Sequence, residues 1–219
     1  METSPRTALV TGASGLVGGH LLDALLEDPR YTAVHSLGRR ALPRQHPKLH
    51  QHTVDLTRLE EQPLPAAEDA FCCLGTTIKK AGSQEAFRAV DHDAVLAFAR
   101  AAKRAGAQRF LVVTALGANA RSRFFYNRVK GEVEEALRGV GFPSLVIAQP
   151  SLLLGERAES RPGEQVATVV SRALAPVLRF LEGRPIEART VARALLTLAW
   201  QPPTGTRVVP SGELQTLGR

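Results

Sequence analysis

Short, almost wholly apolar segments recur along the first two thirds of the chain and alternate with stretches whose apolar residues follow a helical spacing. Apolar runs of this length, bounded by glycine or proline, are typical of buried strands. Strands that are apolar on both faces predict a parallel sheet covered by helices on each side. The six predicted strands fall in residues 7–10, 31–38, 51–56, 69–75, 109–117 and 143–155, the last with the loop that follows it.

The segments between these strands have the pattern of amphipathic helices. Residues 21–29 show helical spacing directly after a glycine-rich turn. Residues 83–106 predict one long helix, with Ser83 as its N-terminal cap and Gly106 at its end. Residues 124–139 predict a further helix that ends in glycine. The order of elements therefore indicates an α/β fold with a doubly wound parallel sheet.

The last third of the chain has a different pattern. A polar stretch with proline and glycine predicts an exposed loop, two helical stretches follow, and a short apolar run predicts a terminal strand. We expect a single domain over residues 1–219, with its core in 5–150 and a small, mostly helical cap in 151–219. The loop, the two helices and the strand fall in residues 156–165, 167–183, 188–200 and 206–210.

Composition places the chain among ordinary globular proteins. It has 219 residues, of which 44% are hydrophobic and 22% charged, so disorder is excluded. No apolar run approaches the roughly 20 residues of a membrane span, and the N-terminus has no apolar stretch of the secretory type. We therefore expect a cytoplasmic protein. Adjacent cysteines, Cys72 and Cys73, rarely bridge, and we interpret them as buried apolar residues without a metal.

The net charge of +7 would suit nucleic acid, a membrane surface or a phosphorylated ligand. The basic residues are mostly arginines spread along the chain, and only two tyrosines and one tryptophan are available for base stacking. We interpret the charge as a solvated surface and expect neither a nucleic-acid partner nor a membrane partner.

The strongest local signal is a glycine-rich turn between the first strand and the first helix. Its residues are Gly12, Ala13, Ser14, Gly15, Leu16, Val17 and Gly18, with the spacing G-x-x-G-x-x-G. In a dinucleotide fold, Gly12 allows the tight turn, Gly15 lets the backbone approach a pyrophosphate, and Gly18 lets helix and strand pack closely. The helix N-terminus then offers free N–H groups to the phosphates. The alternative is a turn without a ligand.

Two arginines, Arg39 and Arg40, end the second predicted strand, where NAD-binding chains usually carry an acidic residue. A guanidinium suits a 2′-phosphate, so the sequence favours NADP(H), unless both residues are plain surface charges. Asp55, at the end of the third predicted strand, is placed to hold the adenine edge, with Leu56 beside it to pack on the ring. The remaining predicted cofactor contacts end the fourth and sixth strands: Leu74, Gly75, Thr76 and Pro150.

Tyr126 and Lys130 are four residues apart on a predicted helix, so their side chains share one face. An ammonium near a phenol favours the ionised phenol and helps it to exchange a proton with a carbonyl or alcohol. Lysine is also able to reach the ribose of a bound nicotinamide. The alternative is that both residues lie on the helix surface without a catalytic role.

Several motifs together resemble the short-chain dehydrogenase/reductase superfamily. They are T-G-A-S-G-L-V-G, the strand-end G-R-R and the Y-x-x-x-K of Tyr126 and Lys130. The stretches F-C-C-L-G-T-T, A-G-S, V-D, F-Y-x-x-x-K-G-E-V-E and L-L-x-x-R-x-E-S-R-P-G-E resemble its atypical branch of Tat-interacting, short-chain-dehydrogenase-like oxidoreductases. The resemblance runs from about Thr7 to Glu164 and more loosely beyond.

This resemblance implies a Rossmann-type fold that binds NADP(H), with Tyr126 as acid/base and Lys130 as its partner. It also implies a hydroxyl near the end of the fifth strand that polarises the substrate oxygen, for which Thr114 is the candidate. One member of the usual set is absent, an asparagine on the helix after the fourth strand. The only asparagines are Asn119 and Asn127, so the proton relay of the superfamily is missing or built differently.

Two functions are compatible with these residues. The first is hydride transfer from NADPH to a carbonyl-type substrate that the sequence does not identify. The second is a redox-responsive NADP(H)-binding protein that acts through a protein partner with little or no turnover. A homodimer is expected only by analogy with the fold. Charged residues of the loop after the sixth strand either hold the cap or contact a polar substrate: Glu156, Arg157, Glu159, Arg161 and Glu164.

Overall fold

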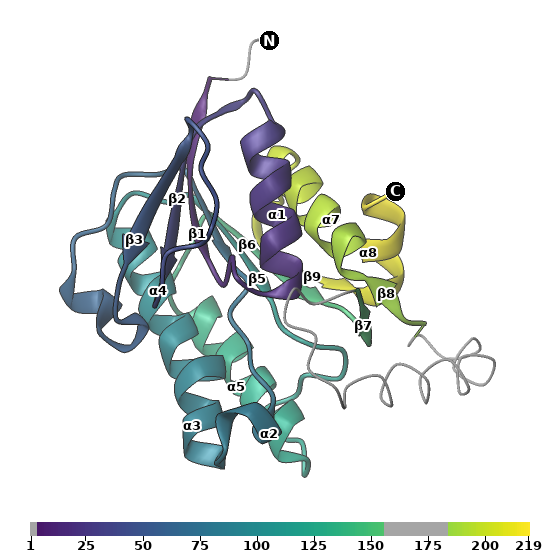
Figure 1. The fold of residues 1–219 in the computed structure, drawn as a ribbon. Coiled ribbons are helices and arrows are strands. Elements are labelled where there is room, and N and C mark those ends of the chain that lie inside the picture. Colours follow the sequence, from purple (N-terminus) through teal and green to yellow (C-terminus); the bar gives the residue numbers. More distant parts are fainter. Residues whose placement is uncertain (1–3, 156–183) are drawn as a thin grey trace.

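The computed structural model describes residues 4–155 and 184–219 (Figure 1). Its centre is a parallel sheet of seven strands in the order β3-β2-β1-β4-β5-β6-β9. The chain runs outward from β1 to β3 and then returns to β4 on the other side of β1. The strands are β1 (Arg6–Thr11), β2 (Tyr31–Gly38), β3 (Leu49–Thr53), β4 (Asp69–Cys72), β5 (Arg109–Val113), β6 (Ser144–Gln149) and β9 (Gly205–Pro210).

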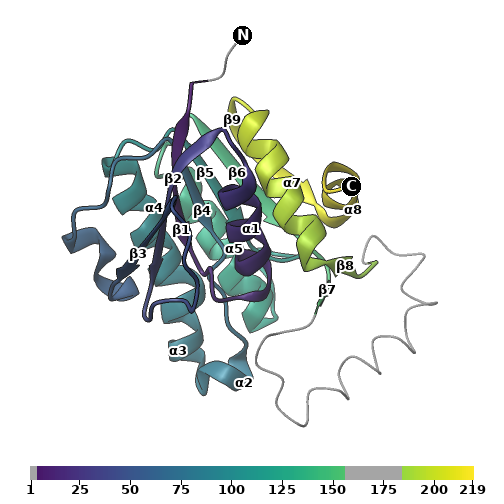
Figure 2. The same ribbon diagram turned by 45° about the horizontal axis from the view of Figure 1, so that its top comes forward.

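Helices cover both faces of this sheet, as Figure 2 shows. On β1, Ala8 and Val10 pack toward α1 (Leu16–Glu27) and α7 (Ala188–Trp200), whereas Leu9 packs toward the opposite layer. Alternate residues of a strand point to opposite faces, which explains why wholly apolar strands are needed here. The opposite layer holds α4 (Ala94–Arg104), α5 (Phe125–Arg138) and the 3₁₀ helix η1 (Leu56–Glu61).

The strand predictions are largely confirmed, with one shift. The third strand was expected at residues 51–56 but occupies Leu49–Thr53, because Asp55 caps η1 and so ends the extended backbone. The connection from β2 to β3 holds no helix, and that from β3 to β4 holds only η1. Helices and strands therefore alternate less regularly than the pattern predicted.

The long helix predicted at residues 83–106 is interrupted. Ser83 does cap its start, since its hydroxyl accepts a hydrogen bond from Ala86 N at 3.1 Å. The helix then consists of α3 (Gln84–Arg88), a π-helical turn η2 (Ala89–Asp93) and α4. The short helix α2 (Ile78–Ala81) precedes it. A π-helical turn inside a helix is rare, and it recurs at functional sites.

The C-terminal part joins the central layers. The predicted helix at 188–200 is confirmed as α7, which packs against α1. The predicted terminal strand is confirmed as β9, which extends the main sheet beside β6. A small second sheet pairs β7 (Leu153–Leu154) with β8 (Ile186–Glu187), and α8 (Ser211–Leu217) ends the chain. The predicted loop at 156–165 and the helix at 167–183 lie outside the described residues.

Cys72 is buried at the end of β4, and Cys73 follows the strand; both thiols are free. Burial raises the pKa of the Cys72 thiol, which fits the expected packing role. In the described ranges, no helix combines the length and the hydrophobicity needed to cross a bilayer.

Candidate functional site

The glycine-rich turn lies at the carboxyl edge of the sheet, directly after β1. Gly12 has a positive φ of 78°, and a Cβ at this position would overlap the carbonyl group of Cys73 after β4. A Cβ on Gly18 would overlap the carbonyl oxygen of Gly12. The two glycines therefore bring β1, β4 and α1 closer together than any side chain permits.

The start of α1 is open toward this edge. Gly15 is the N-cap, it makes no side-chain cap hydrogen bond, and the first turn of α1 contains no acidic residue. The first N–H groups of a helix have no partner within it and carry its positive dipole end. Ser14 and Gly15 are exposed, whereas Val17 is buried in the core and offers only its backbone. This cradle fits a pyrophosphate, which needs close backbone approach and N–H donors.

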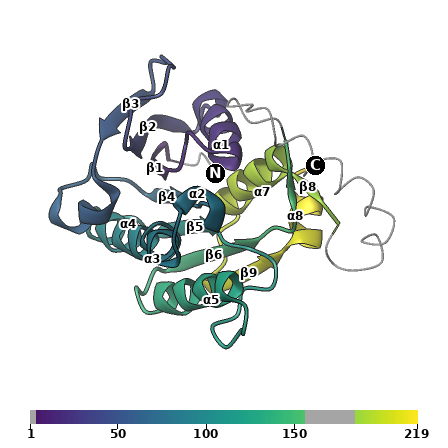
Figure 3. The same ribbon diagram turned by 60° about the horizontal axis from the view of Figure 1, so that its bottom comes forward.

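The turn after β4 lies beside the glycine-rich turn, at the point where the chain reverses its direction across the sheet (Figure 3). In open parallel sheets, ligands bind at this switch point, outside the carboxyl ends of the strands. Leu74 is buried, Gly75 is exposed, and Thr76 N donates a hydrogen bond to Asp91 Oδ2 at 2.9 Å. Pro150, after β6, is buried, and its carbonyl oxygen accepts from Leu116 N.

Arg39 and Arg40 are exposed directly after β2, and within residues 4–155 and 184–219 neither makes an ion pair or a side-chain hydrogen bond. Asp55 is used locally: its Oδ1 accepts from Thr57 N at 2.9 Å and from Thr57 Oγ1 at 2.7 Å. These hydrogen bonds lower the pKa of the Asp55 carboxyl. Leu56 packs on the core layer that contains α4. Their predicted contacts with an adenine stay predictions.

The structure brings Tyr126 and Lys130 to the same edge on the first two turns of α5. Tyr126 is 37% exposed, and its ring lies against Phe87 of α3, with ring centroids 5.6 Å apart. Lys130 is only 4% exposed, and its Nζ lies 2.7 Å from Asp91 Oδ1. The lysine is therefore an ion-paired residue under the turn after β4.

Asp91 is the functional candidate that our reading of the sequence missed. It is fully buried on η2, between Thr76 on one side and Lys130 on the other. The pattern contained a signal, because Asp91 lies four residues after Phe87 and seven before Phe98, on the apolar face of an amphipathic segment. A carboxylate in such a position needs a partner. This helix carries no asparagine, and its buried polar side chain at the site is that of Asp91.

Burial raises the pKa of the Tyr126 phenol; the Lys130 charge lowers it, and the Asp91 charge raises it again. The net direction is upward. This differs from the expectation that the neighbouring lysine makes the phenol easy to ionise, since burial, together with the Asp91 charge, outweighs the ammonium. Near neutral pH Tyr126 carries its proton, so it is prepared to act as an acid.

Thr114 lies directly after β5, as expected, and its hydroxyl is engaged within the protein. Its Oγ1 donates a hydrogen bond to Glu134 Oε1 at 2.6 Å, and Gln149 Nε2 donates to both oxygens of the same carboxylate. Burial raises the pKa of Glu134, while the bonds from Thr114 and Gln149 lower it, and the net direction is upward. A hydroxyl has one proton to donate. That proton is directed at Glu134, two helical turns beyond Tyr126, and the Ala148 carbonyl oxygen lies 3.3 Å away as a second acceptor. The predicted contact of Thr114 with a substrate oxygen stays a prediction.

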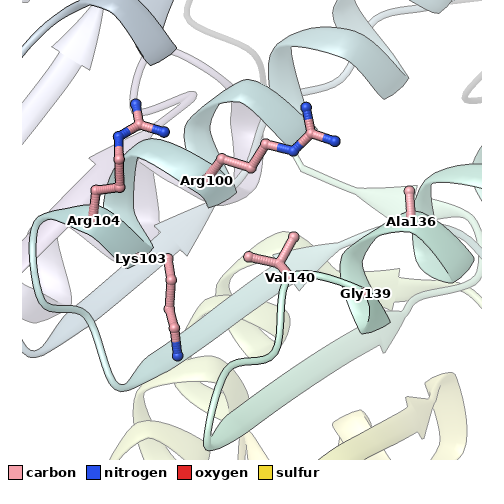
Figure 4. A pocket seen from close by; sticks show the side chains of 6 residues that line it. All are labelled: Arg100, Lys103, Arg104, Ala136, Gly139 and Val140. Atoms are coloured by element: carbon pink, nitrogen blue, oxygen red, sulfur yellow. The ribbon is translucent and has the colours of Figure 1, made fainter.

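A separate hollow of about 410 Å³ lies at the C-terminal ends of α4 and α5, at the opposite edge of the sheet (Figure 4). Its three basic side chains point apart, and each bonds to the protein: Arg100 to Glu60 Oε1, Lys103 to the Gly141 carbonyl and Arg104 to the Glu60 carbonyl. These cations are held by local partners and do not converge on one point, so the hollow does not resemble a binding site.

Comparison with known proteins agrees with this geometry. A family described as NAD(P)H-binding matches residues 12–199. HTATIP2 of Rattus norvegicus is 36% identical over 206 residues, which cover 91% of this chain and 84% of the relative. The protein fmp52 of Emericella nidulans is 33% identical over 212 residues, covering 92% and 89%.

Solved structures show the same fold at low sequence identity. MoeE5 in complex with UDP-glucose and NAD has a TM-score of 0.69 at 18% identity, covering 97% of this chain and 80% of that one. The UDP-N-acetylglucosamine 4-epimerase from Methanobrevibacter ruminantium M1 has a TM-score of 0.71 at 18% identity, covering 95% and 77%.

The relatives also correct one expectation. The sequence led us to expect a cytoplasmic protein, but the fmp52 relatives from Emericella nidulans, Eremothecium gossypii and Aspergillus fumigatus are all named mitochondrial. The expectation of a cytoplasmic protein therefore does not stand.

The glycine cradle, the switch-point site and the matches over most of the chain lead to one assignment. The chain belongs to the NAD(P)H-binding family and is an atypical short-chain dehydrogenase/reductase, related to HTATIP2 and the fmp52 proteins.

Proposed function

We propose that this protein is an NADP(H)-dependent oxidoreductase that reduces a carbonyl-type substrate, with Tyr126 as the proton donor. One observation carries the proposal: the partly exposed phenol of Tyr126, whose pKa burial raises, lies one helical turn from the buried Lys130, at the edge that also carries the dinucleotide cradle. A tyrosine held in its acidic form suits reduction, in which the product oxygen must gain a proton.

The cofactor is proposed to be NADP(H) because of Arg39 and Arg40. Both are exposed at the carboxyl end of β2, where a dinucleotide presents its adenosine ribose. Planar guanidinium groups suit a phosphate, and no acidic residue follows β2 at this point to hold a free ribose diol. Asp55 and Leu56 would flank the adenine.

The pyrophosphate would lie on the N–H groups at the start of α1, in contact with the Ser14–Gly15 backbone. Gly75, Thr76 and Pro150 would border the nicotinamide half. Lys130 has three donor protons, so its ammonium is able to bond a ribose hydroxyl while it stays paired with Asp91. NADPH supplies a hydride when bound.

Tyr126 completes the reaction at the substrate oxygen. As the carbonyl carbon gains the hydride, the C=O π bond breaks and its electron pair moves to oxygen. That oxygen takes the proton from the Tyr126 phenol, which gives an alcohol and a tyrosinate. The Lys130 ammonium stabilises the tyrosinate, and water at its exposed side returns the proton.

The test is a binding titration with NADPH and with NADH on wild type and on Arg39→Ala/Arg40→Ala. We expect NADPH to bind more tightly in the wild type and the preference to collapse in the double variant. Lys79→Ala/Lys80→Ala is the matched control, because it removes an equally exposed pair of cations from α2. An equal loss of NADPH affinity in both double variants would show that the arginines contribute only through the general positive charge of the surface.

A second candidate is an NADP(H)-binding regulator that responds to redox state and acts through a protein partner. One observation favours it: the hydroxyl of Thr114 is given to Glu134, so the site lacks the second oxygen donor expected at that position. This candidate predicts a complex whose stability differs between NADPH and NADP⁺. NADPH oxidation with a panel of carbonyl compounds, abolished by Tyr126→Phe, would favour the enzyme instead.

A further inference from the structure

The carboxylate of Asp91 joins two parts of the site. Its Oδ2 accepts a hydrogen bond from Thr76 N at 2.9 Å, and its Oδ1 lies 2.7 Å from Lys130 Nζ. Oδ1 has no directed hydrogen-bond partner among the described residues, so the contact with the lysine is one of charge. A Cβ on Gly75 would lie 3.6 Å from Asp91 Oδ1 and 3.9 Å from Lys130 Nζ. The ion pair therefore lies directly beneath the exposed turn after β4.

The backbone is distorted at this point. The segment from α3 to α4 would form one regular helix by its apolar pattern, yet residues Ala89–Asp93 form a π-helical turn centred on Asp91. Such a turn costs local regularity and is retained mainly at functional sites. Here it accompanies a carboxylate that faces the site from the apolar side of the segment.

Stability alone does not account for this ion pair. Both partners are almost wholly buried, with side-chain exposures of 5% for Lys130 and 1% for Asp91. The desolvation of two buried charges offsets most of their attraction, and apolar residues of similar volume usually serve the fold as well or better. A buried pair beside a partly exposed phenol has a more specific use.

That use is charge balance at Tyr126. On the elements packed against it, Arg88 pairs with Glu132, and His92 pairs with Asp93. Lys130 and Asp91 are the charges that act on the phenol, and they act in opposite directions. Besides Tyr126, the ionisable groups here are Cys72 at the end of β4 and Cys73 after it, Glu85 and Arg88 of α3, Asp91, His92 and Asp93 of η2, and Arg128, Lys130, Glu132, Glu134, Glu135 and Arg138 of α5.

We propose that Asp91 is a positioning residue of this site: it fixes the Lys130 ammonium beneath the turn after β4 and balances the charge that this ammonium places near Tyr126. In the reaction proposed above, on which its catalytic meaning rests, Asp91 opposes the ionisation of Tyr126 that Lys130 promotes. Asparagine at this position would keep the bond to Thr76 and lose the charge balance.

The ionisation of Tyr126 is directly measurable, because the chain has only two tyrosines. Tyr31 is fully buried, and its hydroxyl donates to Asp69, so it does not ionise in the folded protein until strong alkali. Tyrosinate absorbance, followed upward from about pH 8 on the folded protein, therefore reports Tyr126. Subtracting the titration of Tyr126→Phe removes any contribution from Tyr31. Far-UV circular dichroism at each pH marks the folded range.

We expect Asp91→Asn to lower the midpoint of Tyr126 by about one pH unit, because Lys130 then acts on the phenol without compensation. Asp93→Asn is the matched control: the same change two residues away, on an exposed side chain, should leave the midpoint in place. Asp91→Asn/Lys130→Gln removes both charges, and its midpoint should lie close to that of the wild type. This double variant also serves if Asp91→Asn does not fold.

An unchanged or raised midpoint in Asp91→Asn would overturn the proposal, as would a double variant whose midpoint falls well below the wild type. The titration requires neither substrate nor cofactor. A midpoint that shifts as expected in a protein that binds no NADPH would therefore leave Asp91 in its role and refute the proposed function. A fixed midpoint in a protein that binds NADPH would do the reverse.

Discussion

The two edges of the central sheet each carry one tyrosine among charged residues, and they use it in opposite ways. At the amino edge, Asp69 is fully buried and accepts a hydrogen bond from Tyr31 at 2.7 Å. Arg6 and Arg109 pair with the same carboxylate. Each charge there has a partner within the protein.

The indole of Trp200 covers this network at the amino edge. The guanidinium groups of Arg6 and Arg30 lie 3.9 and 4.1 Å from the centre of its rings, and Arg30 also pairs with Asp28. Burial raises the pKa of Tyr31, and the neighbouring Asp69 raises it further. Both carboxylates of this cluster, Asp28 and Asp69, are paired with arginines, so the cluster stabilises the fold.

The carboxyl edge is incomplete by comparison. Tyr126 makes no side-chain hydrogen bond in the part of the chain that the structure describes, and Lys130 keeps donor protons beyond its contact with Asp91. Glycines replace side chains at the turns. Charges that are all paired within the protein indicate a structural role. A side chain with a shifted pKa and no hydrogen-bond partner, beside exposed glycine backbone, is instead a candidate for a functional site.

The largest expected effect is a loss of stability on replacing Asp69 in the charge network at the amino edge. Asp69→Asn leaves Arg6 and Arg109 facing an uncharged, buried amide, and should cost about 3–5 kcal/mol of unfolding free energy. Urea denaturation measures it. Affinity for NADPH should stay unchanged in the molecules that remain folded. A large loss of affinity there would show that the two edges are coupled and would contradict their separation.

The next prediction compares the same substitution, tyrosine to phenylalanine, at Tyr126 and at Tyr31. Tyr126→Phe should lower the turnover of a verified substrate by about 100-fold or more, because the proton donor is lost, with little change in stability. Tyr31→Phe should instead cost about 1–3 kcal/mol of stability, because Asp69 loses a buried hydrogen bond, with turnover kept. Steady-state kinetics and denaturation on both variants give the answer. Turnover within twofold in Tyr126→Phe would exclude the proposed acid.

The glycines offer a matched pair within one turn. Gly18→Ala places a Cβ against the Gly12 carbonyl, and should cost about 1–3 kcal/mol and weaken NADPH binding. Gly15→Ala has ordinary extended backbone and a Cβ 3.1 Å from the same oxygen, so its effect on stability should be smaller. Thermal unfolding with and without NADPH compares them. Equal destabilisation in the two variants would refute the packing role of Gly18.

The smallest expected effect concerns pH. Burial raises the pKa of Asp28, but its hydrogen bonds and ion pair with Arg30 outweigh burial and hold the pKa below its ordinary value. A carboxyl with a lowered folded pKa contributes stability above its unfolded pKa and loses it as the pH falls through the folded one. Arg30→Ala should therefore cost about 0.5–1 kcal/mol at neutral pH and less below the folded pKa of Asp28, where only its contact with the Trp200 ring remains to be lost. A loss that is equal at both pH values would leave only packing on Trp200.

The sequence predicted the strands, the glycine-rich turn and the placement of Tyr126 and Lys130 on one helix, because these follow from local spacing. It did not predict the break in the helix at Asp91, because the break accompanies a partner on α5 that is distant in the chain. The bond from Thr114 to Glu134 was missed for the same reason. The place of β9 in the main sheet also depends on tertiary pairing with β6.

The measurement that tests the central claim most directly is hydrogen–deuterium exchange with and without NADPH. Binding should slow exchange in the peptides that contain Gly12–Gly18 and Leu74–Thr76, because these turns form the proposed cradle. Exchange should stay unchanged around Asp69 and Trp200 at the amino edge. Protection at the amino edge alone, or at neither edge with saturating NADPH, would contradict the assignment of the carboxyl edge as the cofactor site.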